Sequence, residues 1–182
     1  MRLSPMATTP AASRRRLLQA LAAFGAGAAL PKLAAAQGQP RPWPKDRPTP
    51  QLELPGYDGP AWSLRSARGS VVVLNFWAAW CEPCRTEMPS LDLLAERHKN
   101  DGLIVVAVNF QETDTAIRRF MEQTPVALPI VRDRDGAASR AWGVRVFPTT
   151  VLVGRDGAAR WSVVGEVDWT GPSARQWIAA LL

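Results

Sequence analysis

A buried strand that runs directly into a helix is the feature that most constrains this chain. Val71 to Phe76 is a run of apolar and β-branched residues, typical of a strand covered on both faces. The segment 82–99 then carries apolar residues at helical spacing, which predicts a helix. The junction between them is Cys81-Glu82-Pro83-Cys84, so two cysteines lie at the start of the predicted helix.

The start of a helix is a favourable place for a cysteine thiolate, because the first N–H groups have no helical partners and the helix dipole is positive there. Cys81 occupies this position. Pro83 falls at an early helical position, where its missing N–H costs nothing. The three-residue offset places Cys84 on the same side of the first turn as Cys81, so the two sulfur atoms can pair.

These two cysteines are the only ones in the chain, and three interpretations compete. A structural disulfide would stabilise little, because the loop that it closes is short and already held by the helix. A closed zinc site needs four ligands, and two cysteines with the one histidine, His98, fall short of that number. The sequence therefore favours the third interpretation, a dithiol that cycles between reduced and oxidised forms.

The segment FWAAWCEPCRTEMP resembles the active-site segment of thioredoxin-fold proteins, in particular the TlpA/ResA-type periplasmic thiol-disulfide oxidoreductases. The similarity extends from about Gln51 to the C-terminus. The residues that carry it are Trp77, Ala78, Trp80, Cys81, Pro83, Cys84 and Pro89. The resemblance implies an α/β, thioredoxin-like three-layer fold. We expect a mixed central sheet with helices on both faces, an N-terminal β-hairpin and a helix-strand insertion over residues 111–132.

The resemblance also implies roles for three side chains. Cys81 would be the attacking cysteine, Cys84 the resolving cysteine, and Glu87 the group that manages the proton of the pair. Cytoplasmic thioredoxin has an aspartate as proton acceptor where this chain has Asn75, and an asparagine cannot accept that proton. The alternative for Glu87 is a solvated glutamate that the helix dipole stabilises.

A second part of the expected site surrounds Pro148. A proline at the entrance of a strand can simply end an edge. Thioredoxin-fold proteins instead keep a cis-proline facing the cysteine pair, and the resemblance assigns Pro148 to that role. The backbone of Phe147 would then be exposed for strand-like pairing with a substrate segment. Trp80 and Pro83 complete the expected substrate-binding residues, whereas most of the eight tryptophans are expected to pack in the interior.

The excess of basic residues lies at the N-terminus. Of the 22 lysines and arginines, five precede Gln37, whereas all 16 acidic residues follow it. The chain beyond Gln37 is therefore nearly neutral. The high net charge of the whole sequence is then no evidence that the protein binds nucleic acid.

Residues 1–36 predict an export signal. Ser13-Arg14-Arg15 resembles the start of a twin-arginine signal, and a modest apolar run over residues 17–30 leads to Ala34-Ala35-Ala36 as a cleavage site. The alternative is an uncleaved membrane anchor, although the run is shorter than the ~20 residues that span a bilayer. We expect a periplasmic location, where disulfides form and persist.

The rest of the chain divides into a linker and a thioredoxin-like domain. Residues 37–50 alternate proline with charged and polar residues, which predicts an extended Pro-rich linker. The domain covers residues 51–182 and begins with a hairpin over 51–64. The later elements are predicted as a strand over 103–110, a helix over 115–123 capped by Thr113 or Asp114, a strand over 128–131, a helix over 137–142, strands over 151–153 and 160–164, and a helix over 174–182 capped by Thr170 or Ser173.

The sequence thus predicts a monomeric enzyme that exchanges thiols and disulfides through Cys81 and Cys84, without a cofactor or a metal. Glu82 and Glu87 are acidic neighbours that disfavour a thiolate, which favours a reductase over an oxidant. The resemblance implies protein substrates from cytochrome c maturation or copper-site assembly, and a membrane thiol-disulfide electron donor. Two alternatives stay open, a disulfide-forming oxidase of the same fold and a copper-delivery protein, for which Met88 is slender support.

Overall fold

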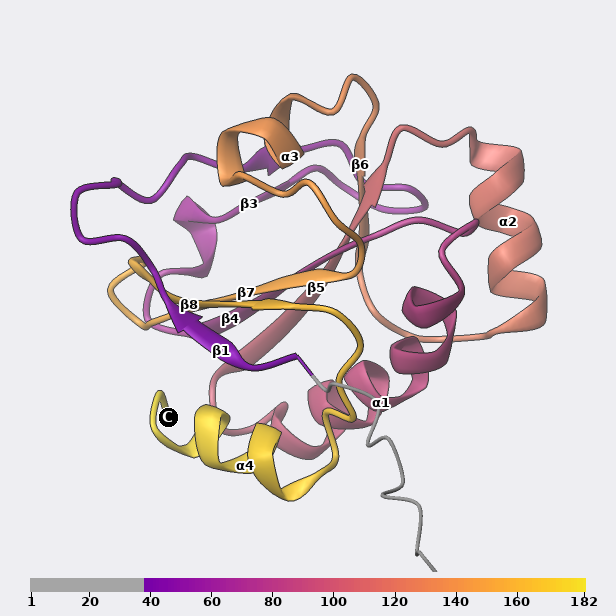
Figure 1. The fold of residues 1–182 in the computed structure, drawn as a ribbon. Coiled ribbons are helices and arrows are strands. Elements are labelled where there is room, and N and C mark those ends of the chain that lie inside the picture. Colours follow the sequence, from indigo (N-terminus) through magenta and orange to yellow (C-terminus); the bar gives the residue numbers. More distant parts are fainter. Residues whose placement is uncertain (1–37) are drawn as a thin grey trace, which may run out of the picture. The chain divides into compact units, whose positions relative to one another are not determined.

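The computed structural model describes residues 38–182, which form a central sheet with helices on both faces (Figure 1). In spatial order the six strands of the sheet are β1 (Pro40–Pro42), β8 (Ala159–Val164), β7 (Thr149–Val153), β4 (Val71–Trp77), β5 (Leu103–Phe110) and β6 (Ile130–Asp133). The helices are α1 (Glu82–His98), α2 (Asp114–Gln123), α3 (Ala137–Trp142), α4 (Pro172–Ala179) and the 3-10 turn η1 (Arg65–Ala67). A separate hairpin pairs β2 (Glu53–Leu54) with β3 (Trp62–Ser63), as predicted. No helix of this described part is both long and apolar enough to cross a membrane.

Strand β4 occupies the middle of the sheet and ends at the predicted active site. It runs parallel to β5, with Val71 opposite Leu103, and antiparallel to β7, with Phe76 opposite Thr149. All residues of β4 are buried, as its apolar composition predicts. The expected mixed sheet of the thioredoxin-like fold is therefore confirmed.

Each face of the sheet has its own hydrophobic core, because successive residues of a strand point to opposite faces. Val71 and Val73 lie in the core beneath α1, α2 and α4. Val72 and Leu74 lie in the opposite core, which α3 and the β2–β3 hairpin cover. Burying one such side chain contributes roughly 1.5–3 kcal/mol. The two cores therefore fix β4, and with it the position of the segment that follows.

The helix-strand insertion is present as α2 and β6. Thr113, one of the two predicted caps, accepts a hydrogen bond from Ala116 N–H at 3.2 Å. Strand β6 is Ile130–Asp133, two residues later at both ends than the predicted 128–131. Pro129 has no N–H to donate and contributes only its carbonyl oxygen, which accepts Ala107 N–H at 3.0 Å. It pairs parallel with β5 and forms the edge of the sheet.

Helix α4 differs from the prediction at its start. It begins at Pro172 and its N-cap is Gly171, whereas the sequence predicted a cap at Thr170 or Ser173. A proline suits the first turn because its φ is already helical. Thr170 donates its hydroxyl to Asp168 Oδ1 at 2.6 Å, so its side chain is engaged in a turn before the helix.

The predicted linker over residues 37–50 is wrong for its central part. Pro40–Pro42 forms the edge strand β1, which pairs with Trp161–Val163 of β8. Trp43 is then buried, donates its indole N–H to Arg47 O at 3.0 Å and packs against Trp142 with ring centroids 5.7 Å apart. Prolines are tolerated in an edge strand, because its outer side needs no N–H donors. Composition alone therefore suggested a linker where the fold has a strand.

We expect Trp43→Ala to lower the free energy of unfolding by about 3–5 kcal/mol, because it removes a buried indole and its packing on Trp142. Chemical denaturation of the oxidised protein measures this change. Arg41→Ala, at an exposed position of β1, is the matched control and should change the free energy by less than about 0.5 kcal/mol. A loss below about 1 kcal/mol for Trp43→Ala would favour the linker interpretation instead.

Candidate active site

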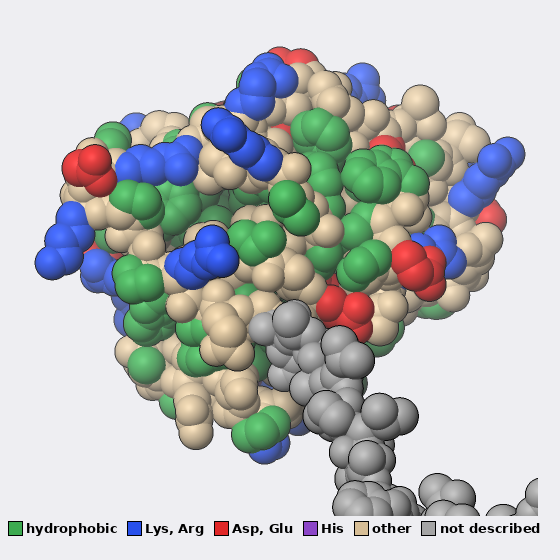
Figure 2. All heavy atoms as spheres, viewed as in Figure 1, with side chains coloured by type: hydrophobic (Ala, Val, Ile, Leu, Met, Phe, Trp, Pro, Cys, Tyr) green, Lys and Arg blue, Asp and Glu red, His purple; other side chains and the backbone are tan. Residues whose placement is uncertain are grey.

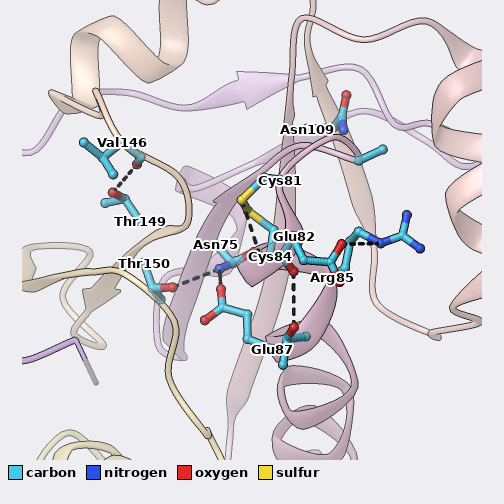
Figure 3. The surroundings of a disulfide bond; sticks show 12 residues. Asn75, Cys81, Glu82, Cys84, Arg85, Glu87, Asn109, Val146, Thr149 and Thr150 are labelled. Atoms are coloured by element: carbon cyan, nitrogen blue, oxygen red, sulfur yellow. Dashed lines mark hydrogen bonds and ion pairs between the residues drawn. A yellow bond between two sulfur atoms is a disulfide. The ribbon is translucent and has the colours of Figure 1, made fainter. Parts of the chain in front are cut away.

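The two cysteines lie at the start of α1, shortly after the end of β4, and they form a disulfide with Cα atoms 5.3 Å apart (Figure 3). Cys81 is the N-cap of α1 and has an extended backbone conformation. Its sulfur accepts a hydrogen bond from Cys84 N–H at 3.3 Å. A first-turn N–H group of α1 therefore points at Cys81, which is the arrangement that favours a thiolate there.

Cys81 and Cys84 differ in solvent exposure. Cys84 is fully buried, whereas Cys81 keeps 5% of its surface exposed and follows Trp80, which is 66% exposed. Pro83 lies between them on the exposed side of the first turn. An approaching partner therefore meets Cys81 before Cys84.

Glu87 is buried inside the protein, so the alternative of a solvated glutamate is wrong. Its Oε1 accepts a hydrogen bond from Asn75 Nδ2 at 2.6 Å, and its Oε2 accepts one from Val167 N–H at 3.1 Å. Asn75 also donates to Thr150 Oγ1 at 3.0 Å. Figure 3 shows Glu87 extending from α1 toward Asn75 on β4, and the Asn75 nitrogen facing both the Glu87 carboxyl group and the Thr150 hydroxyl.

Burial dominates the protonation of this carboxyl group. Removal from water raises the pKa of Glu87 from 4.5 to about 8, although the hydrogen bonds from Val167 and Asn75 act in the opposite direction. Glu87 is therefore mostly protonated and neutral at pH 7. It can give up or take a proton close to physiological pH, which an exposed glutamate cannot.

This neutral state corrects one step of the sequence-based argument. Glu87 was expected to disfavour a Cys81 thiolate through its negative charge, and at pH 7 it carries little charge. Glu82 is exposed over 84% of its side chain and pairs with Arg85 at 3.4 Å. The acidic influence on Cys81 is thus weaker than the sequence suggests, because one glutamate is neutral and the other is solvated and paired.

The remaining predicted substrate residues gather beside the disulfide. The Phe147–Pro148 peptide bond is cis, as predicted, and Pro148 is buried. The Phe147 ring meets the exposed Trp80 edge to face, with centroids 5.8 Å apart. It also packs against Phe110 at 4.8 Å, a residue that the sequence did not single out. The three aromatic rings form a continuous cluster next to Cys81.

Glu112 is a residue of the site that the sequence reasoning missed. Its Oε2 accepts hydrogen bonds from Ala79 N–H and from Asn109 Nδ2, each at 2.7 Å. Because Ala79 lies two residues before Cys81, this carboxylate fixes the loop that presents the disulfide. The sequence could have indicated Glu112, because it follows β5 and the carboxyl ends of the parallel strands β4 and β5 must lie at the same edge of the sheet.

His98 and Met88, the two residues considered as metal ligands beside the cysteines, form other contacts. His98 lies in the last turn of α1 and its Nδ1 is 2.7 Å from Asp101 Oδ2. Met88 is fully buried in the core beneath α1. Between residues 38 and 182 no group of three or more His, Cys, Asp or Glu side chains is arranged to hold a metal ion.

Comparisons with known proteins agree with this geometry. Residues 46–162 match the model of the AhpC/TSA family. The thiol-disulfide oxidoreductase ResA of Bacillus thuringiensis subsp. konkukian is 32% identical over 117 residues, covering 64% of this chain and 68% of the relative. A crystal structure from Chlorobium tepidum, assigned as the thiol:disulfide interchange protein DsbE, has a TM-score of 0.69 and 32% identity, covering 74% of this chain and 95% of that one. The exposed lipoprotein thioredoxin Etrx1 of Streptococcus pneumoniae has a TM-score of 0.65 and 25% identity, covering 72% of this chain and 100% of that one.

The raised pKa of Glu87 predicts how stability depends on pH. The folded protein holds a proton on Glu87 that the unfolded chain loses above about pH 4.5, so this proton stabilises the fold most at low pH. We therefore expect the free energy of unfolding of the oxidised wild type, relative to Glu87→Gln, to fall between pH 4.5 and about pH 8, by at most about 5 kcal/mol. Urea denaturation at several pH values in this window measures the difference.

The matched control for this experiment is Glu96→Gln, an exposed glutamate on the same helix. Its stability should run parallel to that of the wild type over the whole pH window, because this substitution is at the exposed surface and leaves the buried carboxyl group of Glu87 in place. Parallel curves for Glu87→Gln as well would show that Glu87 is not protonated at neutral pH.

Proposed function

We propose, because the chain belongs to the AhpC/TSA family and is a thiol-disulfide oxidoreductase of the thioredoxin fold, that it acts as a reductase of disulfides in exported proteins. The observation that carries the proposal is the buried, protonatable Glu87 one turn after a disulfide at the start of α1, of which Cys81 reaches the surface. In this arrangement Cys81 would supply the nucleophilic thiolate, and Glu87 would accept and return the proton of Cys84. No further cofactor takes part in this scheme.

The reaction begins with the reduced dithiol. The Cys81 thiolate attacks one sulfur of the substrate disulfide, which forms a mixed disulfide and releases the other substrate sulfur as a thiolate. Cys84 then loses its proton and attacks the Cys81 sulfur. This step forms the Cys81–Cys84 disulfide and releases the second substrate thiolate. The substrate gains two electrons, and the enzyme dithiol loses them.

Glu87 is the general base for Cys84 in this scheme. A buried thiol is hard to ionise, because burial disfavours the thiolate, so a base close to Cys84 is needed for the second attack. A carboxylate that takes this proton becomes neutral, and a neutral Glu87 is what the pKa of about 8 predicts for the oxidised protein. When an electron donor reduces the disulfide again, the same carboxyl group returns the proton to Cys84.

The surroundings of Cys81 support the reducing direction. Strongly oxidising members of the superfamily stabilise the thiolate of the reduced form and have a nucleophile pKa of about 3.5. In the described part of the chain the only hydrogen bond to the Cys81 sulfur comes from Cys84 N–H. Arg85, the nearest cation in sequence, pairs with Glu82 instead. This environment gives the thiolate moderate stabilisation, which favours a low potential.

Substrate docking would use the aromatic cluster and the adjoining backbone. The exposed Trp80 and the half-buried Phe147 present apolar surface next to Cys81, and the backbone at Phe147 would pair with an extended substrate segment. By resemblance to the TlpA/ResA type, we propose proteins of cytochrome c maturation or of copper-site assembly as substrates. A membrane thiol-disulfide protein would supply the electrons, and the enzyme would act as a monomer.

The proposed place of action is the periplasm. The predicted twin-arginine signal over residues 1–36 lies outside the described residues, and the relative from Streptococcus pneumoniae is an exposed lipoprotein. Cleavage after Ala36 would leave Gln37 as the first residue. We expect mass spectrometry of the periplasmic fraction to give the mass of residues 37–182. A full-length protein confined to the membrane fraction would support the uncleaved anchor instead.

The direction of electron flow decides between the reductase and the oxidase. We expect the Cys81–Cys84 couple to have a midpoint potential near the thioredoxin value of about −270 mV, because its thiolate is only moderately stabilised. Equilibration with a dithiothreitol buffer of known ratio, followed by alkylation and mass spectrometry, measures this potential. Thioredoxin treated in parallel serves as the reference. A midpoint near −120 mV, together with oxidation of a reduced unfolded protein, would assign the chain to the oxidants.

A further inference from the structure

A hollow lined by arginines lies beside the segment that leads to the cis-proline. Its volume is about 600 Å³, and we name it the arginine hollow. The residues that line it are Arg47, Arg140, Gly143, Val144 and Arg145. They come from the segment after β1, from α3 and from the loop after α3, so the fold brings three cations together from separate parts of the chain.

Two of the three guanidinium groups are held in place. Arg47 donates to the carbonyl oxygen of Ala141 and lies over the Trp43 ring, 4.8 Å from its centroid. Arg140 donates from Nη1 to Asp135 O at 2.9 Å. Carbonyl oxygens orient a guanidinium group but leave its charge in place. The hollow therefore presents fixed positive charges with donors to spare.

No carboxylate of the described chain neutralises this charge. Among residues 38–182, no Asp or Glu oxygen lies within 4 Å of a side-chain nitrogen of Arg47, Arg140 or Arg145. The Asp135 carboxylate instead accepts Ala137 N–H at 2.9 Å. Some arginines outside the hollow, such as Arg132, are paired directly with aspartates, and others, such as Arg68, are not, so the hollow differs in bringing three such arginines together. Like charges that converge without a partner repel one another, so a bound anion would stabilise the arrangement.

The arginine hollow adjoins the surface on which the substrate would dock. Arg145 stands two residues before Phe147, and the intervening Val146 is 56% exposed. Phe147 in turn contacts Trp80 beside Cys81. Figure 2 shows Lys and Arg side chains over α3 and hydrophobic side chains on the same face of the molecule. A partner seated on the aromatic cluster can therefore reach the hollow with a neighbouring segment.

We propose that the arginine hollow binds an acidic segment of the protein whose disulfide is reduced at Cys81. Guanidinium groups bind carboxylates through paired N–H donors, and a fixed group loses less freedom on binding than a mobile one. The acidic segment would flank the substrate disulfide and pass over Val146. This inference rests on the proposed function, and it adds a charge requirement for the substrate.

The test uses two disulfide-bonded peptides that differ only in one flank, which carries glutamates in one peptide and glutamines in the other. Stopped-flow measurement with the reduced full-length protein gives kcat/KM for each. We expect the acidic peptide to be preferred about threefold to tenfold at low ionic strength, and the preference to fade at about 0.5 M salt. In the double variant Arg140→Gln/Arg145→Gln, the preference should fall below about twofold.

The matched control is Arg68→Gln, which removes an exposed arginine from a different hollow near Thr49 and Arg65. It should keep the preference of the wild type. Equal rates for the two peptides, or an equal loss of preference in Arg68→Gln, would overturn the arginine hollow as a specific site. Failure to reduce either peptide would contradict the proposed reductase function instead.

One further measurement separates a protein partner from a lipid surface. Sedimentation with phosphatidylglycerol vesicles should show the same weak binding for the wild type and for Arg140→Gln/Arg145→Gln. Vesicle binding that depends on these two arginines, without a preference between the peptides, would assign the hollow to anionic lipid headgroups and overturn the proposal.

Discussion

The hydrogen bond between Asn75 and Glu87 ties the central strand β4 to the active-site helix α1 inside the protein. Both side chains are buried, and Glu87 is the member of the pair that can gain or lose a proton. An amide can offer an N–H group to a carboxylate or, after rotation, a carbonyl oxygen to a carboxylic acid. Asn75 can therefore satisfy Glu87 in both protonation states, and its Oδ1 has no other partner in the described structure. An aspartate at position 75 would place a second carboxyl against the first and couple their titrations.

The register of the sheet assembles the rest of the site around this pair. Parallel β4 and β5 end at the same edge, which brings Glu112 to the loop before Cys81. Antiparallel β7 starts where β4 ends, with Thr149 opposite Phe76, so the cis-proline segment arrives at the same edge. Three segments that are distant in sequence thus meet through strand pairing. Helix α1 adds its first-turn N–H groups at that point.

Local sequence patterns were sufficient for most elements and for the central chemistry. The strand from Val71 and the helix start at Cys81 each carry their own signal in a few neighbouring residues, whereas the cis-proline at Pro148 was assigned by the resemblance to thioredoxin-fold proteins. Strand β1 carries none, because its stability comes from pairing with β8 and from the contact of Trp43 with Trp142, both far away in sequence. The state of Glu87 was missed for the same reason. Helical spacing places Glu87 on the same buried face of α1 as Cys84 and Leu91, but the size of its pKa shift depends on the segments that cover this face.

Charged groups are distributed unevenly around the site. Close to the sulfur atoms full charges are few, since Glu87 is neutral at pH 7 and Glu82 is paired with Arg85 in solvent. The short-range features at the sulfur atoms are the Cys84 N–H group, which donates to Cys81, and the burial of Cys84, and the proposed low potential rests on them. Three positive charges without a carboxylate partner are gathered in the arginine hollow, which the disulfide does not line. Because exposed charges act over a screened distance of about 8 Å at physiological salt, the proposed role of these arginines is to steer an acidic partner toward the aromatic cluster.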